Sequence, residues 1–480
     1  MLKSLNRTTT ATPRTQPIKV LQFGEGNFLR AFVDWMIDIL NEKTTFNGAV
    51  QIIQPIQNGM GAELNAQDGL YHLVLNGVRQ GQPVRETRLI TCVSGVIDPH
   101  KDYLAFLQSA ENPDLKFIVS NTTEAGISFN SSDIDPKIMP TSFPGKLTSW
   151  LFHRYKLFRG DIAKALTILP CELIEKNGEA LRSAILQYAA HWKLEDGFRQ
   201  WIIEHTLFCN TLVDRIVPGF PKDTIDEIMQ EIGFEDRLVV TAEPFHLWVI
   251  EPILIPGASI EKLRSALPLE QAGLQVKFVS DLGPYRTRKV RILNGAHTAM
   301  VPVGYLRGLR SVREVIDDAY AGDFVRKALE TEIIPTLDLP KEELQQFSDD
   351  VLERFQNPFI RHELKSIALN SISKYQVRVL PSVLEYIHRT GALPERLLQS
   401  LAALILFYRG EWQGAEMPVN DTPAVVAVCQ EAWSKGDADI AVEKILSSRE
   451  LWNTDLTQVK GLAADVKKHL GRMADPVKAG

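Results

Sequence analysis

Cysteine is scarce in this sequence. The 480 residues include four, Cys92, Cys171, Cys209 and Cys429, and no two of them have the spacing of a CxxC zinc or redox motif. Four distant cysteines in so long a chain also make no disulfide framework. Such usage is typical of a reducing compartment, and we therefore expect a cytoplasmic protein.

Long hydrophobic runs are missing too. The longest, near residues 401–408, is much too short to cross a bilayer. Residues 1–20 are basic and rich in threonine, but they contain no apolar segment of the kind that directs secretion. We expect no membrane association and a flexible start to the chain.

The chain has no excess of basic residues. Its formal net charge is −6 and its pI is about 6.0, which argues against a general nucleic-acid binder. A local basic pocket for a small anion stays open. The composition, 45% hydrophobic and 23% charged, is that of a soluble globular protein, and 480 residues are too many for one core. The sequence does not give the oligomeric state, and a monomer is compatible with it.

Short apolar segments alternate with helical patterns through the first part of the chain. The strand-like segment 18–24 runs into residues 24–43, whose apolar side chains recur at helical spacing. Further strand candidates are residues 49–57, 88–97, 115–123, 165–173, 238–252 and 274–282. This alternation predicts an α/β fold with a mostly parallel sheet. From Pro284 the pattern is almost wholly helical, so we predict an α/β domain over residues 1–280 and a helical domain over residues 281–480.

The first motif, QFGEGNFLR at residues 22–30, joins the first strand to the first helix. Glycines at such a turn let a pyrophosphate approach the N-terminus of the helix. We therefore predict that a dinucleotide binds at Phe23, Gly24, Gly26, Asn27 and Phe28. An ordinary strand-to-helix turn is the alternative, because glycines are common there.

Two parts of the usual dinucleotide fingerprint are absent. Leu29 stands where a third glycine is usual. The second strand ends in Gln54 and Gln57, without the acidic residue that binds the ribose hydroxyls. This strand therefore leaves NAD and NADP both open.

Two polar segments follow later strands of the predicted sheet. SNTTEAGIS, residues 120–128, places Thr123 and Glu124 at a strand end, where cofactor crevices form in parallel sheets. In LPCELIEKNGEAL, residues 169–181, the amide of Asn177 could donate a hydrogen bond to a developing alkoxide. For both segments a plain turn is the alternative.

A charged pair and a polar helix complete the set. Asp214 and Arg215 are flanked by apolar residues and need partners, which a structural ion pair would also provide. In RKVRILNGAHTAM, residues 288–300, an α-helix would carry Lys289, Asn294 and His297 on one face. An ammonium, a carboxamide and an imidazole would then point into the same space, although satisfied core residues would give the same pattern.

These segments together resemble the mannitol dehydrogenase family of long-chain polyol dehydrogenases. The resemblance covers nearly the whole chain and rests on FGEGNFLRAF near the start, TLVDRIVP in the middle and KVRILNGAH at the domain boundary. SNTTEAGIS, PCELIEKNGEAL and EIIPTLDLP look like the members that reduce a keto sugar acid.

The resemblance implies a Rossmann-type N-terminal domain, an all-helical C-terminal domain, NAD as cofactor, a small sugar-acid substrate and no catalytic metal. Lys289 matches the family's general acid/base lysine, and Asn294 matches an asparagine that stabilises the oxyanion. His297 matches a histidine that orients the substrate, and Asp214 matches an aspartate of the substrate region. Polyol members carry an acid–asparagine pair after the cysteine, where this chain has Glu172-Leu173, so we expect Asn177 to replace the lost amide.

A carboxylate on the substrate would call for a cation. Residues 357–381 offer Arg361, His362, Lys374 and Arg378, and we expect at least one of them to contact the substrate, a solvated basic helix face being the alternative. The identity of the substrate stays open, and the keto sugar acid fructuronate and the polyol mannitol are among the candidates. A nucleotide-binding sensor without catalysis is the rival from another class, although a sensor need not keep a proton donor.

Overall fold

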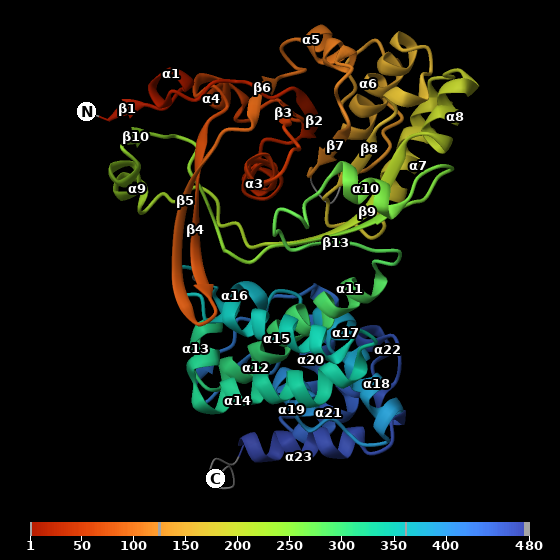
Figure 1. Ribbon diagram of the computed structural model, residues 1–480. Coiled ribbons are helices and arrows are strands. Elements are labelled where there is room, and N and C mark those ends of the chain that lie inside the picture. Colours follow the sequence, from red (N-terminus) through yellow and green to blue (C-terminus); the bar gives the residue numbers. More distant parts are fainter. Residues whose placement is uncertain (1, 123–125, 361, 475–480) are drawn as a thin grey trace. The chain divides into compact units, whose positions relative to one another are not determined.

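The computed structural model describes residues 2–122, 126–360 and 362–474. It divides into two compact units, one formed by residues 1–76 and 83–282 and the other by residues 77–82 and 283–480 (Figure 1).

The first unit is built on a sheet with the order β13-β12-β9-β8-β7-β2-β3-β6. Its strands are β2 (Ile18–Phe23), β3 (Ala49–Ile53), β6 (Val93–Ile97), β7 (Phe117–Ser120), β8 (Thr167–Pro170), β9 (Leu207–Asp214), β12 (Leu247–Pro252) and β13 (Val276–Phe278). The strands from β6 to β9 pair in parallel, whereas β12 is antiparallel to β9. In chain order, these six parallel strands have the 3-2-1-4-5-6 arrangement of a Rossmann fold, which confirms the predicted class.

Helices of the first unit connect these strands. They are α1 (Arg7–Thr10), α2 (Asn27–Leu29), the π-helical η1 (Arg30–Asp34), α3 (Trp35–Lys43), α4 (Gly61–Ala66), α5 (Tyr103–Gln108), α6 (Phe143–Leu157), α7 (Asn177–His191), α8 (Asp196–Glu204), α9 (Ile225–Ile232) and α10 (Ile260–Ala266), with 3₁₀ turns η2 (Ser109–Glu111) and η3 (Ile162–Lys164).

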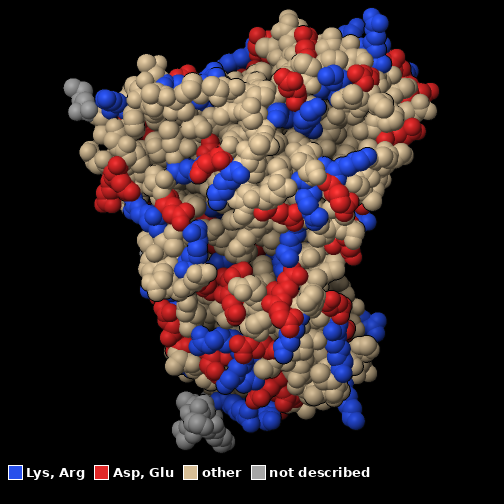
Figure 2. Space-filling view, viewed as in Figure 1, with Lys and Arg blue, Asp and Glu red and all other residues tan. Residues whose placement is uncertain are grey.

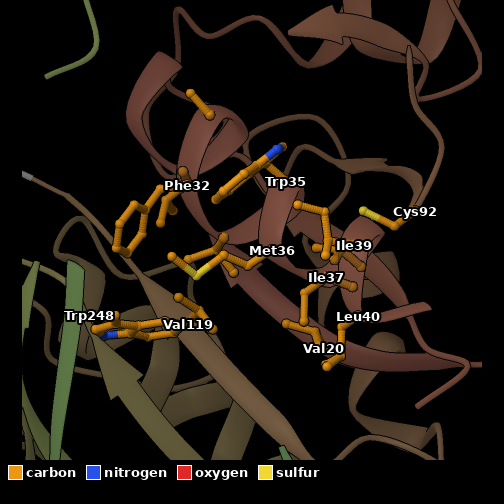
Figure 3. Close-up of a cluster of buried hydrophobic side chains, with 14 of the residues drawn as sticks. Val20, Phe32, Trp35, Met36, Ile37, Ile39, Leu40, Cys92, Val119 and Trp248 are labelled. Atoms are coloured by element: carbon orange, nitrogen blue, oxygen red, sulfur yellow. The ribbon is translucent and has the colours of Figure 1, made fainter. Parts of the chain in front are cut away.

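The core of this unit forms where the helix that follows β2, made of α2, η1 and α3, packs on the sheet. Phe32, Trp35, Met36 and Ile39 are buried together with Val20, Val119 and Trp248 (Figure 3). Burial of an apolar side chain of this size contributes roughly 1.5–3 kcal/mol, so this face fixes the helix that follows the glycine turn. The helical spacing of Phe32, Trp35, Met36 and Ile39 in the sequence predicted this helix correctly.

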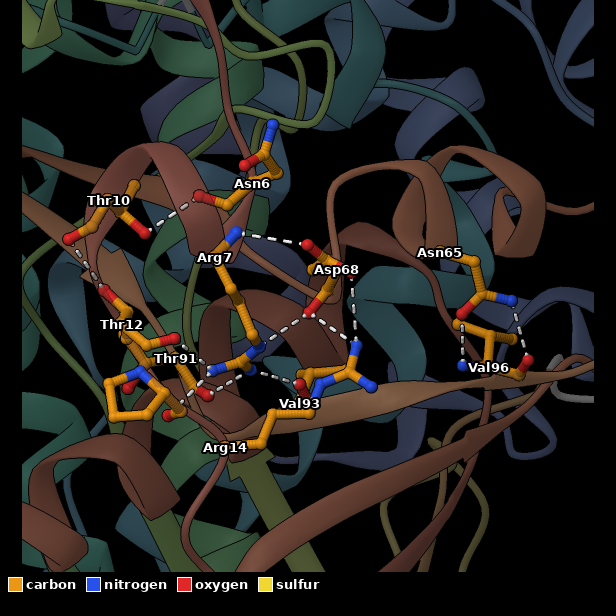
Figure 4. A network of polar contacts seen from close by, with 11 residues as sticks. Asn6, Arg7, Thr10, Thr12, Arg14, Asn65, Asp68, Thr91, Val93 and Val96 are labelled. Carbon is orange, nitrogen blue, oxygen red and sulfur yellow. Dashed lines mark hydrogen bonds and ion pairs between the residues drawn. The ribbon is translucent and has the colours of Figure 1, made fainter.

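The start of the chain is anchored rather than flexible, contrary to our expectation. The guanidinium of Arg7 donates to the carbonyl oxygens of Thr91 at 2.8 Å and Val93 at 2.9 Å, and its backbone N–H donates to Asp68 (Figure 4). Nearby, Asn65 exchanges two hydrogen bonds with the backbone of Val96. The N-terminal segment is thereby tied to the edge of the sheet at β6.

Outside the main sheet, the described residues form three smaller sheets, and the last of them belongs to the second unit. β4 (Tyr71–Arg79) lies between β11 (Val240–Ala242) and β5 (Gln82–Ile90), β1 (Lys3–Ser4) pairs with β10 (Phe234–Glu235), and β14 (Glu411–Trp412) pairs with β15 (Ala415–Glu416). The prediction of one strand over residues 88–97 was wrong, because these residues form the end of β5 and the whole of β6, which are separate strands. The β4–β5 turn at Gln80 and Gly81, both with positive φ, groups with the second unit, where Gly81 N donates to Glu353 Oε2 at 2.8 Å.

The second unit is helical, as predicted. Its elements are α11 (Gly283–Arg288), π-helical η4 (Lys289–Asn294), α12 (Gly295–Leu306), α13 (Val312–Asp317), α14 (Ala319–Lys327), π-helical η5 (Ala328–Ile333), η6 (Ile334–Thr336), α15 (Lys341–Phe355), α16 (Leu364–Ile367), α17 (Ser371–Arg378), α18 (Leu380–Thr390), α19 (Glu395–Phe407), α20 (Pro423–Trp433), α21 (Ala438–Ser447), α22 (Arg449–Trp452), η7 (Leu456–Gln458) and α23 (Leu462–Ala474). The apolar α19 packs against α12 and α23. This packing holds α12, which carries His297, against the core of the unit.

Candidate functional site

The glycine turn after β2 forms a cradle of backbone atoms. Gly24 has a φ of +121°, and a Cβ on it would lie 3.1 Å from the carbonyl oxygen of Asn121. Its N–H donates to the carbonyl oxygen of Ile53, and its carbonyl oxygen accepts from Gln22 Nε2 at 3.0 Å. The turn is therefore fixed from both sides, and only glycine fits at its first position.

The buried side chain of Arg30 forms hydrogen bonds with the rest of this turn. It is 1% exposed, and its Nε donates to the carbonyl oxygen of Glu25 at 3.1 Å. Its Nη2 donates to Asn27 Oδ1 at 2.7 Å and its Nη1 to the carbonyl oxygen of Leu238. Burial lowers the pKa of Arg30. The Asn27 side chain is thus braced by Arg30, while Phe28 stacks on Phe32 with ring centroids 5.0 Å apart.

The edge formed by β7 and β8 is fixed by a buried carboxylate. Glu172, 3% exposed, accepts hydrogen bonds from Ser120 Oγ at 3.1 Å and from the N and Oγ1 of Thr122 at 3.0 and 3.1 Å. Burial raises its pKa. The predicted cofactor residues Thr123 and Glu124 follow directly in the chain but lie outside the described residues.

Asn177 does not offer the amide that we expected of it. Its side chain is fully buried, and Nδ2 donates to the carbonyl oxygens of Pro170 at 3.0 Å, Glu172 at 3.1 Å and Thr211 at 3.3 Å. Oδ1 accepts from the N–H groups of Gly178 and Thr211. Because backbone atoms saturate this amide, the expectation that it donates to substrate needs correction: its contacts are those of a structural link between β8, α7 and β9.

Asp214 and Arg215, the charged pair at the end of β9, lie in different environments. Asp214, 5% exposed, is the last residue of the strand and pairs in register with Leu247. The Arg215 guanidinium lies over the Trp35 ring, 4.1 Å from its centroid, and donates to the carbonyl oxygens of Glu243 and Ala31. Arg215 therefore links the end of β9 to the helix that follows β2.

In the helical unit, Lys289, Asn294 and His297 lie on one continuous helix whose middle turn is π-helical. The wider turn begins at Lys289 and ends at Asn294, and the N–H of Gly295 bonds to the carbonyl oxygen of Val290. Bonds of this type join residues five apart, so Lys289 and Asn294 lie more nearly in line than an α-helix would allow. His297 follows three residues later, at the spacing of neighbours on an α-helix. The predicted helix was right, but its predicted regular geometry was not.

Two rings fix the orientation of His297. Its imidazole stacks on Phe355 with centroids 4.3 Å apart and meets His362 edge to face at 4.8 Å. Burial lowers the pKa of His362, which favours a neutral ring at neutral pH. The structure thereby brings together two of the residues that the sequence singled out separately.

The other predicted cations lie on the helix that packs beside this one. Lys374 donates to the carbonyl oxygen of Ile367 at 2.9 Å, and burial lowers the pKa values of Lys374 and Arg378. A Cβ on Gly295 would lie 3.2 Å from the carbonyl oxygen of Arg378, so this glycine admits the end of α17 beside Asn294. The fourth predicted cation, Arg361, lies outside the described residues.

Two buried charges at these sites were not predicted from the sequence. Arg30 is the last residue of the predicted segment 22–30, and Glu172 lies in the predicted segment 169–181. Neither was given a role of its own, although both side chains are buried. Arg291, within the π-helical turn, has a pKa lowered by burial. A π-helical turn itself leaves no clear mark in a sequence, since it is stabilised by its packing.

No group of three His, Cys, Asp or Glu side chains in the part of the chain that the structure describes is arranged to hold a metal ion. No helix among the described residues is both long and apolar enough to span a bilayer. On the face shown in Figure 2, Lys and Arg are interspersed with Asp and Glu.

Comparison with known proteins gives matches over both units. The family model "Mannitol dehydrogenase Rossmann domain" matches residues 18–261, and "Mannitol dehydrogenase C-terminal domain" matches residues 281–474. The altronate oxidoreductase of Bacillus subtilis is 46% identical over 98% of this chain and 96% of its own. That of Yersinia enterocolitica is 46% identical over 96% and 95%.

Solved structures share the fold. A D-sorbitol dehydrogenase without substrate is 25% identical, covers 99% of both chains and has a TM-score of 0.80. The mannitol 2-dehydrogenase of Pseudomonas fluorescens, solved with NAD and D-mannitol, is 22% identical, covers 99% of this chain and 98% of its own, and has a TM-score of 0.67.

Proposed function

Because the chain belongs to the mannitol dehydrogenase family, we propose that it is an NAD-dependent oxidoreductase that interconverts tagaturonate and altronate. The observation that carries this proposal is the identity of 44–47% with altronate oxidoreductases, over nearly the full length of both chains. Such identity extends over both the Rossmann domain and the helical domain. We assign dinucleotide binding to residues 1–280 and substrate binding to residues 281–480.

The first βα turn fits a dinucleotide. Gly24 is held in a conformation that favours glycine, and a side chain there would meet Asn121. Phe23, Gly26, Asn27 and Phe28 complete the turn ahead of the helix, where backbone N–H groups attract phosphate. NAD, bound here, supplies or accepts the hydride. We keep Thr123 and Glu124 as proposed contacts of the same cofactor.

Three residues of the helical domain provide the remaining chemistry. Lys289 delivers a proton to the ketone oxygen during reduction and removes it during oxidation. Asn294 donates a hydrogen bond to that oxygen as negative charge grows on it, an interaction worth roughly 3 kcal/mol in other enzymes. His297, held by Phe355 and His362, orients a neighbouring hydroxyl group. Asp214 is proposed to contact the substrate as well.

A hexuronate carries a carboxylate that must be balanced. Arg361, Lys374 and Arg378 supply cations and His362 a hydrogen-bond donor, and we propose that at least one of these four residues binds the carboxylate. The lowered pKa values of Lys374 and Arg378 support this, because a charge removed from water is stabilised by an anionic partner.

We further propose a cytoplasmic enzyme, since all four cysteines are buried and free.

The test is a substrate panel. Oxidation of NADH is followed with tagaturonate, fructuronate and fructose at matched concentrations, and altronate and mannitol are compared in the reverse direction with NAD. The proposal expects kcat/KM to be highest with tagaturonate. A preference for fructuronate would move the protein to another uronate, and a preference for fructose would end the uronate assignment. Binding of NADH without turnover of any of these would favour a sensor.

A further inference from the structure

The first βα turn carries a carboxylate that the chemistry above does not use. Glu25 stands between Gly24 and Gly26 and is 5% exposed. Its side chain extends toward the residues that follow β3, where Oε1 lies 3.4 Å from the N–H nitrogen of Met60. A Cβ on Gly59 would lie 2.0 Å from the same oxygen. The carboxylate of Glu25 therefore fills the space beside the end of the second parallel strand.

That place is where dinucleotide-binding folds usually hold an acid for the adenosine ribose. In this chain the residue after β3 is Gln54, and its amide is committed to its own turn. Gln54 Nε2 donates to the carbonyl oxygen of Ile56 at 2.9 Å, and Oε1 accepts from Gly61 N at 3.0 Å. Gln54 thus closes the turn, whereas Glu25 brings a carboxylate to the same strand end.

The Glu25 carboxylate is buried and makes few hydrogen bonds. Among the described residues, the hydrogen bonds to this carboxylate come from backbone N–H groups, those of Met60 and of Glu25 itself. Burial raises its pKa; the backbone hydrogen bonds and the charge of Arg30 oppose this shift, and the charge of Asp98 adds to it. Asp98 follows directly after β6, and its side chain is 14% exposed. A buried carboxylate of this kind is stabilised by additional hydrogen-bond donors.

We propose that Glu25 accepts hydrogen bonds from the hydroxyl groups of the adenosine ribose and makes the protein select NAD over NADP. The two hydroxyls are the donors that the carboxylate lacks. A 2′-phosphate at the same position would meet a negative charge on Glu25 and a second one on Asp98. The carboxylate that usually follows the second strand is thus supplied in this chain by Glu25 of the first βα turn. This inference rests on the proposed function, because it concerns the dinucleotide assigned there.

The test is direct binding of NADH and NADPH to the full chain, measured by calorimetry or nucleotide fluorescence without any sugar acid. The wild type should bind NADH far more tightly. Glu25→Gln, which keeps the shape but removes the charge, should weaken NADH binding and strengthen NADPH binding. The ratio of the two Kd values should fall by about ten-fold or more, the range expected for a hydrogen bond to a charged group.

Asp98→Asn is the matched control, since it removes a neighbouring charge without touching the proposed ribose contact. It should shift the ratio much less than Glu25→Gln does. A ratio that stays the same in Glu25→Gln, or that falls only in Asp98→Asn, would overturn the inference.

A second measurement needs no variant and covers the case in which Glu25→Gln fails to fold. NADH lacking the adenosine 2′-hydroxyl should bind the wild type about ten-fold more weakly, because a site built to bind a hydroxyl rejects the analogue without it. Equal affinity for the two nucleotides would contradict the role of Glu25. If the wild type bound neither NADH nor NADPH, the proposed function would fail as well, and the two failures are thereby distinguished.

Discussion

The side-chain amide of Asn177 makes hydrogen bonds in both directions with the backbone of Thr211. Oδ1 accepts from the Thr211 N–H at 2.8 Å, and Nδ2 donates to the Thr211 carbonyl oxygen at 3.3 Å. The residue stands first in α7, while Thr211 is in the middle of β9. The two elements are therefore joined through one buried carboxamide.

This link predicts a loss of stability rather than of chemistry. Asn177→Ala leaves several buried backbone groups unpaired and should lower the free energy of unfolding by about 3 kcal/mol. The fraction that folds should keep kcat within a few-fold of the wild type. Urea unfolding and turnover per folded molecule are compared with those of Gln187→Ala, an exposed change on the same helix. A large loss of kcat in fully folded protein would restore Asn177 to the active site.

Gly24 and Gly26 should respond differently to alanine. Gly24 has a φ of +121° and a crowded Cβ position, whereas Gly26 has a φ of −65° and nothing within 4 Å of its Cβ position. Gly24→Ala should therefore lower the melting temperature of the free protein, at a cost of about 1–3 kcal/mol for the backbone strain. Gly26→Ala should leave that temperature nearly unchanged and weaken NADH binding. Equal melting temperatures for the two variants would show that the turn is not constrained as described.

Asp34 should make stability depend on pH. It is fully buried in the first core, and burial raises its pKa to about 7, although hydrogen bonds from Tyr71 and Gln22 oppose the shift. A carboxyl whose folded pKa lies above its unfolded value takes up protons on folding. The contribution of Asp34 to the free energy of unfolding is therefore fully present only below its pKa in the unfolded chain. It is lost as the pH rises through its folded pKa of about 7.

Asp34→Asn should remove this dependence. Relative to the wild type, the variant should gain about 2–3 kcal/mol more at pH 8 than at pH 5, as the linkage relation gives for these pKa values. Unfolding by urea at the two pH values measures the difference. Asp196→Asn, at a side chain that is 92% exposed, is the control and should show no such change. A gain that is equal at both pH values would mean that Asp34 is ionised in the folded protein throughout.

Asn294 is predicted to act on the transition state. Asn294→Ala should lower kcat by about 100-fold or more while KM for the sugar acid changes little, as expected for a lost oxyanion donor. Asn294→Asp should be at least as damaging, because it places a negative charge beside a developing alkoxide. Thr298→Val, which removes the hydroxyl bonded to the Asn294 carbonyl oxygen, serves as the control on the same helix. An effect confined to KM would make Asn294 a ground-state binding residue instead.

Much of the fold could be predicted from the sequence, because its periodicities are strong. Apolar side chains at helical spacing after the first strand identified the helix that packs on the sheet, and the change to helical patterns after residue 280 is real. The β4–β5 hairpin was missed although Gln80-Gly81 is a turn signal between alternating segments. The strand β9 was also missed, since its buried polar residues Asn210 and Thr211 disguised it.

The sites were less accessible to sequence reasoning than the fold. Lys289, Asn294 and His297 could be grouped by spacing, but the π-helical turn that aligns them depends on packing against α15 and α17. Asn177 was assigned to substrate because an amide in a loop looks available, and its backbone partners cannot be read from the sequence. Glu25 could not be predicted as a ligand-binding residue, because the sequence does not show that its side chain reaches the end of β3.

The central claim is that the Lys289 ammonium group transfers the proton, and kinetics of Lys289→Ala with tagaturonate and NADH test it most directly. We predict a fall in kcat of about 1,000-fold with unchanged NADH affinity, in the range seen for lost general acids. Added primary amines should restore part of the rate, more strongly for amines that fit the vacated space. A variant that turns over at a nearly normal rate, or that shows no response to any amine despite intact NADH binding, would contradict the account.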